Sequence, residues 1–215
     1  MEKPALKYCG IRSLKDLQLA AQSQADYLGF IFAESKRKVS PQDVKKWLNQ
    51  VRVEKKVAGV FVNESIERMS RIAKELKLDV IQLHGDENPA DADALRKLTD
   101  CEIWKALHHH HNTTQEIARF IDNVDGFVID SSVKGARGGT GVAFSWDCVP
   151  EYQRAVIGKR CFIAGGVNPD SVKGLLKWQP AGIDLASGIE KNGQKDKNLM
   201  RLLEERMNRY VSISE

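Results

Sequence analysis

Apolar residues fall into two alternating patterns along the chain. Short runs rich in β-branched and aromatic residues are typical of buried β-strands, and the longer segments between them carry apolar residues at helical spacing. Such alternation predicts repeated βα units around a parallel sheet. Eight segments are candidate strands: Leu6 to Cys9, Tyr27 to Phe32, Val57 to Val62, Val80 to Leu83, Ile103 to Ala106, Gly126 to Asp130, Cys161 to Ala164 and Gly182 to Ala186.

The segments between the strands carry signals for helix starts. A serine or asparagine side chain accepts a hydrogen bond from the first N–H groups of a helix, and proline fits its first turn. Four predicted helices begin with such residues, at Ser13, Ser40-Pro41, Ser65 and Asn168-Pro169. The other four are expected from about Pro89 to Leu98, Thr113 to Ile121, Trp146 to Tyr152 and Asp196 to Tyr210.

Eight βα units in 215 residues predict a (β/α)8 barrel, the TIM-barrel fold of the α/β class. Because no linker or composition shift divides the chain, we expect residues 1–215 to form a single domain. The alternative is an open doubly wound sheet, which normally carries a glycine-rich nucleotide-binding motif after its first strand. The residues after Cys9 contain neither GxGxxG nor GxxxxGKS/T, so the barrel is favoured.

Charge and cysteine content exclude several classes of protein. The net charge of +4 is spread over 33 basic and 29 acidic residues, which is too balanced for a nucleic-acid-binding face. The four cysteines are far apart and form no CxxC pair, as expected for a reducing cytoplasm. The longest apolar run, Tyr27 to Ala33, is too short to span a membrane. We therefore expect a cytoplasmic protein, and a monomer because no helix face is unusually apolar.

Three reactive side chains lie where a barrel carries its active site, at the carboxyl ends of strands. Cys9 ends the first strand, Asp130 ends the sixth, and His84 follows the fourth. Each has a plain structural alternative, since a lone cysteine is often a small buried apolar residue and an aspartate can cap a loop. Strand alternation places Lys7 on the face of Cys9, roughly 7 Å away, where its positive charge would favour the thiolate.

Glycine-containing loops follow the last three predicted strands. Glycine allows backbone N–H groups to converge on an anion, and the late loops of barrels commonly bind phosphate. These loops predict a phosphate site that includes Gly139, Thr140 and Gly141, Gly165 and Gly166, and Ser187 and Gly188.

Two further groups of charged or titratable residues follow strands. Arg37, after the second strand, could hold a substrate carboxylate through two parallel hydrogen bonds, although a solvated loop charge is an equally good interpretation. The run His108 to His111 lacks the spacing of a catalytic metal site, and we expect it to be a solvated loop.

Several motifs, in order along nearly the whole chain, together resemble the phosphoribosylanthranilate isomerase family. The motifs are Lys7-Tyr8-Cys9-Gly10-Ile11, Ser35-Lys36-Arg37, Gly59-Val60-Phe61-Val62-Asn63, Gln82-Leu83-His84-Gly85-Asp86, Asp130 with Gly138-Gly139-Thr140-Gly141, Ala164-Gly165-Gly166 and Ser187-Gly188-Ile189-Glu190.

The resemblance implies an enzyme of tryptophan biosynthesis that carries out an Amadori rearrangement of a small phosphorylated substrate. It implies that Asp130 is the acid that opens the ribose ring and that Cys9 is the base that removes the C2 proton. It further implies that Arg37 holds the anthranilate carboxylate, that the glycine loops hold the phosphate, and that His84 lines the site. No metal or other cofactor is implied, since no redox change or hydrolysis occurs.

Two alternatives remain open. The isomerase of histidine biosynthesis performs the same rearrangement on another substrate, but that family relies on paired aspartates, whereas the first strand here ends in Cys9. A barrel that binds phosphorylated metabolites without turnover is the other alternative, and only an activity measurement separates it from an enzyme.

Overall fold

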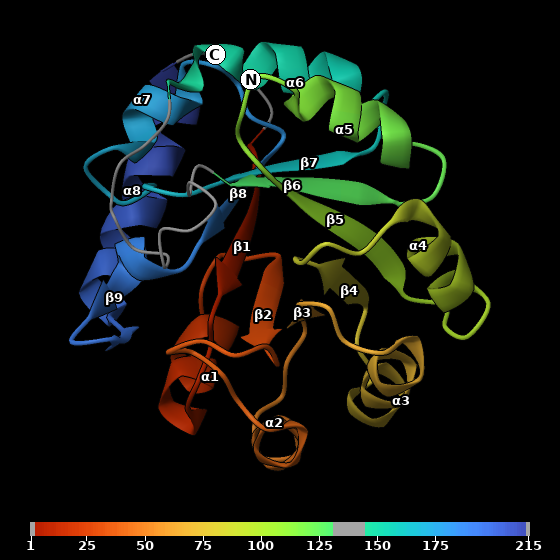
Figure 1. Cartoon of the computed structure of the whole chain (residues 1–215). Coiled ribbons are helices and arrows are strands. Elements are labelled where there is room, and N and C mark those ends of the chain that lie inside the picture. Colours follow the sequence, from red (N-terminus) through yellow and green to blue (C-terminus); the bar gives the residue numbers. More distant parts are fainter. Residues whose placement is uncertain (1–2, 131–144, 214–215) are drawn as a thin grey trace.

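The computed structural model describes residues 3–130 and 145–213, and its main feature is a closed barrel of parallel strands with helices around it (Figure 1). Each strand pairs with the next, and β8 pairs with β1, which confirms the predicted (β/α)8 fold. The strands are β1 (Ala5–Cys9), β2 (Tyr27–Ile31), β3 (Lys56–Phe61), β4 (Val80–Leu83), β5 (Glu102–His108), β6 (Gly126–Asp130), β7 (Arg160–Ala164) and β8 (Gly182–Leu185).

The helices cover the outside of the strand ring (Figure 1), and three begin at the predicted serines. Ser13, Ser40 and Ser65 each accept a hydrogen bond from the backbone N–H three residues later. None of the helices within residues 3–130 and 145–213 combines the length and apolar character needed to cross a membrane. The helices are α1 (Leu14–Ala21), α2 (Pro41–Leu48), α3 (Ile66–Leu76), α4 (Pro89–Arg96), α5 (Thr113–Phe120), α6 (Val149–Ala155), α7 (Val172–Leu176) and α8 (Lys197–Ile213).

Some element boundaries differ from the prediction. The predicted helix start at Asn168 is wrong, because the Asn168 side chain accepts from the N–H groups of Asp170 and Ser171 and folds this stretch into a turn before α7. Strand β5 is longer than predicted and includes His108, which continues the ladder opposite Asp130. The helix predicted from Trp146 starts instead with a 3₁₀ turn, Trp146–Cys148, before α6.

Aromatic side chains fill one end of the barrel interior. The rings of Tyr27, Trp104 and Phe162 contact one another at centroid distances of 4.8 to 5.4 Å. Two cations from strand starts, Lys56 and Arg160, lie over the Tyr27 ring. The aromatic cluster therefore closes the amino-terminal end of the barrel, and the interior positions toward the carboxyl ends are left for polar groups.

A short antiparallel hairpin follows β8 and folds back beside the barrel mouth. It consists of β9 (Glu190–Lys191) and β10 (Gln194–Lys195), with Lys195 directly opposite Glu190. Asn192 and Gly193 connect the two strands, both with positive φ, which is the geometry of a type I′ turn. The hairpin thus carries two charged side chains toward the end of β8.

Candidate active site

Cys9 lies at the carboxyl end of β1, next to a buried ion pair. Lys7 faces Asp184 across the β1–β8 ladder, and its Nζ lies 2.8 Å from Oδ2 of Asp184. The opposite neighbour on β2 is Gly29, where an added Cβ would lie only 2.9 Å from the Cys9 sulfur. Glycine at this position therefore leaves the space that the thiol occupies.

Burial raises the pKa of the Cys9 thiol, and the Asp184 carboxylate adds to the rise. The positive charges of Lys7 and Lys195 oppose this change but do not cancel it. Burial alone would lower the pKa of Lys7, yet Asp184 and Cys9 hold it above its ordinary value, so Lys7 remains a cation. Lys7 therefore favours the thiolate, as its place on the strand predicts, while the net pKa of Cys9 stays high.

Asp130 and His84 lie near each other at the carboxyl ends of β6 and β4. The His84 Nε2 is 3.9 Å from Oδ2 of Asp130, and the side chains are 25% and 20% exposed. On its other side, Nδ1 of His84 lies 2.9 Å from the amide nitrogen of Gln82, which points into the barrel. Burial lowers the pKa of His84 more than Asp130 raises it, so the ring is neutral at pH 7.

A second buried ion pair fixes the loop that carries His84. Glu87 accepts hydrogen bonds from Lys105 at 2.9 Å and from the backbone N–H groups of Gly85 and Asn63 at 2.8 Å. The Lys105 ammonium also donates to the carbonyl oxygen of Gly85. These contacts hold the turn after β4 against the loop after β3, beside a cavity of about 600 Å³ that His84 and His108 help to line.

The histidine run is less solvated than predicted. His108 belongs to β5, and Nδ1 of His109 lies 2.6 Å from the Tyr152 hydroxyl, so these two side chains are partly buried. His110 lies 3.3 Å from a carboxylate oxygen of Glu116. Within the part of the chain that the structure describes, no three His, Cys, Asp or Glu side chains are grouped so that they could hold a metal ion.

The loops after β7 and β8 contact each other closely. Gly165 and Gly166 both have positive φ, a conformation that favours glycine. A Cβ on Gly188 would lie 1.9 Å from the carbonyl oxygen of Val167, so only glycine allows the two loops to meet there. Ser187 begins a 3₁₀ turn in the second loop. The predicted Gly139, Thr140 and Gly141 lie outside the described residues.

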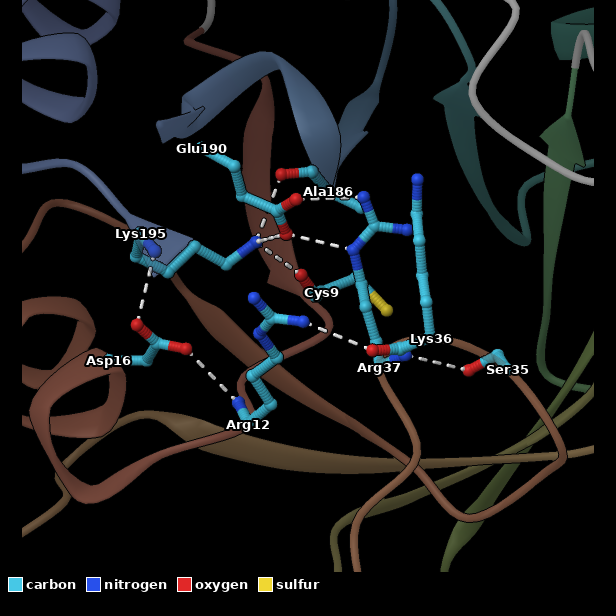
Figure 2. A network of polar contacts seen from close by, with 9 residues as sticks. All are labelled: Cys9, Arg12, Asp16, Ser35, Lys36, Arg37, Ala186, Glu190 and Lys195. Carbon is cyan, nitrogen blue, oxygen red and sulfur yellow. Dashed lines mark hydrogen bonds and ion pairs between the residues drawn. The ribbon is translucent and has the colours of Figure 1, made fainter. Parts of the chain in front are cut away.

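Arg37 reaches the mouth from the loop after β2 and is held by a residue that the sequence did not suggest. Its Nε and Nη2 each donate to the carboxylate of Glu190 at 2.8 Å (Figure 2). Its aliphatic part packs on Gly10, where an added Cβ would lie 2.4 Å from the Arg37 Cδ. The small residue after Cys9 therefore accommodates Arg37.

Lys195 and Asp184 are further site residues that the sequence interpretation missed. Lys195 is buried and contacts Glu190 from the hairpin. The Asn192-Gly193 pair was an available signal for that hairpin. Asp184 has one buried oxygen, Oδ1, without a hydrogen-bond partner within the described residues. Its signal was a carboxylate inside the apolar strand Gly182–Leu185.

Comparisons of the sequence and of the fold with known proteins point to one family. Residues 6–206 match the model of the N-(5′-phosphoribosyl)anthranilate isomerase family. The chain is 90% identical over its full length to the whole N-(5′-phosphoribosyl)anthranilate isomerase of Bacillus subtilis (strain 168). The crystal structure of phosphoribosyl anthranilate isomerase from Thermus thermophilus is 28% identical, with a TM-score of 0.80 over 95% of this chain and 98% of that one.

A further solved structure contains a bound ligand. It is a phosphoribosyl anthranilate isomerase in complex with reduced 1-(o-carboxyphenylamino)-1-deoxyribulose 5-phosphate. It is 25% identical to this chain, with a TM-score of 0.80 over 95% of this chain and 98% of that one.

Proposed function

The chain belongs to the N-(5′-phosphoribosyl)anthranilate isomerase family, and on that premise we propose that Cys9 and Asp130 are the base and the acid of its reaction. The enzyme acts in tryptophan biosynthesis and converts N-(5-phosphoribosyl)anthranilate into 1-(2-carboxyphenylamino)-1-deoxyribulose 5-phosphate. The observation that carries the assignment is the position of both side chains at carboxyl strand ends, where barrel enzymes hold their catalytic groups.

The rearrangement needs one proton delivered and one removed. Asp130 protonates the ring oxygen of the ribose, the C1–O bond breaks, and the nitrogen lone pair forms a Schiff base at C1. The Cys9 thiolate then takes the proton from C2, and the resulting enolamine tautomerises to the ketone. Lys7 stabilises the thiolate by its charge, since it lowers the Cys9 pKa against the effect of burial.

The remaining site residues hold the two ends of the substrate. Arg37 binds the anthranilate carboxylate, and the phosphate lies at the loops of Gly165, Gly166, Ser187 and Gly188, with Gly139, Thr140 and Gly141 as further candidates. His84 lines the site as a neutral ring and takes no part in the proton transfers. Fixing both ends places C2 and the ring oxygen between base and acid, which lowers the barrier through orientation.

The test is turnover of freshly generated phosphoribosylanthranilate, followed by loss of its fluorescence without added metal. We expect Cys9→Ser and Asp130→Asn each to lower kcat by about 10² to 10⁴. Cys101→Ser and Asp122→Asn are matched controls away from the mouth and should retain full activity. Retained activity in Cys9→Ser or Asp130→Asn would overturn that residue's assignment, and an inactive parent chain would leave a barrel that binds metabolites without turnover.

We also propose that the enzyme is a cytoplasmic monomer formed by one domain. The large apolar side chains exposed on the described surface are few and far apart in the sequence, at Val62, Leu98, Ile157, Trp178 and Leu202. All four cysteines are unpaired, as suits a reducing compartment. Sedimentation at several protein concentrations tests the monomer, and a mass that rises with concentration would contradict it.

A further inference from the structure

Lys195 is a buried cation that joins three parts of the barrel mouth. Its Nζ donates to the carbonyl oxygen of Cys9 at 2.6 Å, to that of Ala186 at 2.9 Å and to Oε1 of Glu190 at 3.0 Å (Figure 2). An ammonium has three N–H donors, so these contacts use all of them. Lys195 therefore cannot contact a substrate itself and acts only through the groups that it holds.

Asp16 on helix α1 holds the hairpin in place. One of its oxygens accepts from the backbone N–H of Lys195 at 3.0 Å, and the other accepts from that of Arg12 at 3.2 Å. Asp16 and Lys195 are both buried. The position of Lys195 is thus determined by contacts from β1, α1 and the end of β8.

Glu190 lies between Lys195 and Arg37 and uses only one edge of the guanidinium. The carboxylate accepts from Nε and Nη2, so the group cannot rotate. A guanidinium has a second edge, formed by Nη1 and Nη2, that can bind another carboxylate. Among the residues that the structure describes, none accepts a hydrogen bond from Nη1 of Arg37.

The cluster of Arg37, Glu190 and Lys195 keeps an excess positive charge. The hydrogen bonds from Arg37 and Lys195 outweigh the effect of burial and hold the pKa of Glu190 below its ordinary range, so its carboxylate is ionised. Two cations and one anion leave one positive charge in a partly buried place. One further carboxylate would neutralise it.

We propose that Glu190, held by Lys195, is a positioning residue that turns the second edge of Arg37, formed by Nη1 and Nη2, toward the carboxylate of the substrate. The inference rests on the proposed role of Arg37. Because Lys195 also binds the carbonyl oxygen of Cys9, the same cation ties the carboxylate end of the substrate to the strand that carries the base. Glu190 and Lys195 thus contribute to recognition without touching the substrate.

Positioning and plain electrostatics predict opposite results for Glu190→Gln. Removal of a negative charge beside the substrate carboxylate would tighten binding if charge alone mattered. If positioning dominates, loss of the two charge-assisted hydrogen bonds should lower kcat/KM for phosphoribosylanthranilate about tenfold, mainly through KM. The phosphoribosyl adduct of aniline lacks the carboxylate, and its kcat/KM should change less than about twofold.

Three further variants complete the experiment. Glu190→Asp keeps the charge beside Lys195 but withdraws the carboxylate by one methylene. It should also lose the preference for phosphoribosylanthranilate over the aniline adduct, even if Glu190→Gln folds poorly. Glu102→Gln is the matched control, because Glu102 also lies between a lysine and an arginine, Lys56 and Arg160, at the starts of strands. Glu102→Gln should leave the ratio of the kcat/KM values for the two substrates unchanged. Arg37→Met should abolish the preference for the carboxylate.

The outcomes separate the two proposals. If Arg37→Met keeps the full preference for phosphoribosylanthranilate over the aniline adduct, the role of Arg37 is wrong and the inference fails with it. If Arg37→Met loses that preference while both Glu190 variants keep it or bind more tightly, only the positioning role of Glu190 is wrong. Loss of the preference in Arg37→Met and in a Glu190 variant, but not in Glu102→Gln, supports both.

Discussion

The thiol of Cys9 lies among groups of both charges, and its reactivity depends on their balance. Lys7, Asp184 and Lys195 act on it from β1, β8 and the hairpin, while burial sets the overall direction of its pKa. A base acts only when deprotonated, so the fraction of Cys9 present as thiolate should rise with pH through the neutral range toward its raised pKa.

At the scale of single residues, substitutions of the Lys7–Asp184 pair should move this pH profile in opposite directions. Asp184→Asn removes a negative charge and should shift the titration of Cys9 to lower pH. Lys7→Met with Asp184→Asn removes the larger, thiolate-favouring effect of Lys7 as well and should shift it to higher pH than Asp184→Asn alone. The measurement is the pH dependence of the rate at which iodoacetamide alkylates Cys9 in each variant. Identical midpoints in both variants and the parent would show that Lys7 does not control the thiol.

The residues at strand ends could be found from the sequence, but their partners could not. Cys9 and Asp130 end apolar runs, and strand ends in a barrel point to the mouth. Arg37 stands in a polar loop, and its partner Glu190 lies 153 residues away, a pairing that no local pattern indicates. The pairing exists only because the barrel closes and brings the loops after β2 and β8 to the same end.

Among the structural elements, the β9–β10 hairpin has a specific local requirement at its turn. Gly193 has a φ of +73°, and a Cβ at this position would lie 2.4 Å from Nη2 of Arg12. A side chain here would therefore strain the backbone and push against Arg12 at once. The hairpin carries both Glu190 and Lys195, so a distorted turn should also disturb the site.

Gly193→Ala should destabilise the protein by about 1 to 2 kcal/mol and also raise KM for phosphoribosylanthranilate. Gly158→Ala separates the two effects, because Gly158 has nearly the same φ, +75°, and nothing within 4 Å of an added Cβ. Gly158→Ala should lower the free energy of unfolding only through the strained backbone, and its KM should be unchanged. Urea unfolding and steady-state kinetics of both variants test this, and equal KM values would argue against a role for the turn in recognition.

The element boundaries that sequence patterns missed have local causes. Asn168 resembles a helix cap but closes a turn instead, because its side chain bonds to Asp170 and Ser171 before α7 begins. His108 has no strand preference of its own and joins β5 because its neighbour β6 extends as far as Asp130. Side-chain hydrogen bonds and pairing between strands thus set the element boundaries that the apolar periodicity does not determine.

For the whole molecule, the alternation of apolar patterns was sufficient to predict the barrel, since eight buried strands with helices between them have few other ways to bury both faces. The interior layers were not predictable. The contact of Tyr27 with Trp104 and Phe162 joins strands β2, β5 and β7, and depends on how far the strands are shifted along one another.

The aromatic cluster should dominate the stability of the barrel. Trp104→Ala removes a fully buried ring that contacts Tyr27 and Phe162, and should lower the free energy of unfolding by about 3 to 5 kcal/mol. Because the cluster lies at the end opposite the mouth, the folded fraction should keep its KM. Trp178→Ala, at a side chain that is 39% exposed, is the control and should cost much less. Urea denaturation compares the two.

Acid should weaken the fold through carboxylates at both ends of the barrel. Burial alone would raise the pKa values of Glu102 and Glu190, but hydrogen bonds from cations and from Trp104 to Glu102 hold them below the ordinary value. Groups with a lowered pKa stabilise the folded state above the unfolded pKa of about 4.3, and this contribution is lost as pH falls through the folded value. The urea concentration at the unfolding midpoint should therefore decrease as the pH is lowered below about 4.3. A smaller decrease of the midpoint in Glu102→Gln than in the parent protein would support this role of Glu102. An equal decrease would exclude Glu102 as a cause.

The seam between β1 and β8 gives the molecule one more property. Lys7 closes it through Asp184, and Lys195 closes it through the carbonyl oxygens of Cys9 and Ala186. The Lys7–Asp184 and Lys195–Cys9 contacts join residues that are 177 and 186 positions apart. During synthesis, Cys9 leaves the ribosome early together with Lys7, whereas Asp184 and Lys195 are added only near the end of the chain. The proposed base therefore acquires its full surroundings only when Lys195 has been added, and a nascent chain that stops short of Lys195 would lack the contact of that ammonium with the Cys9 carbonyl oxygen.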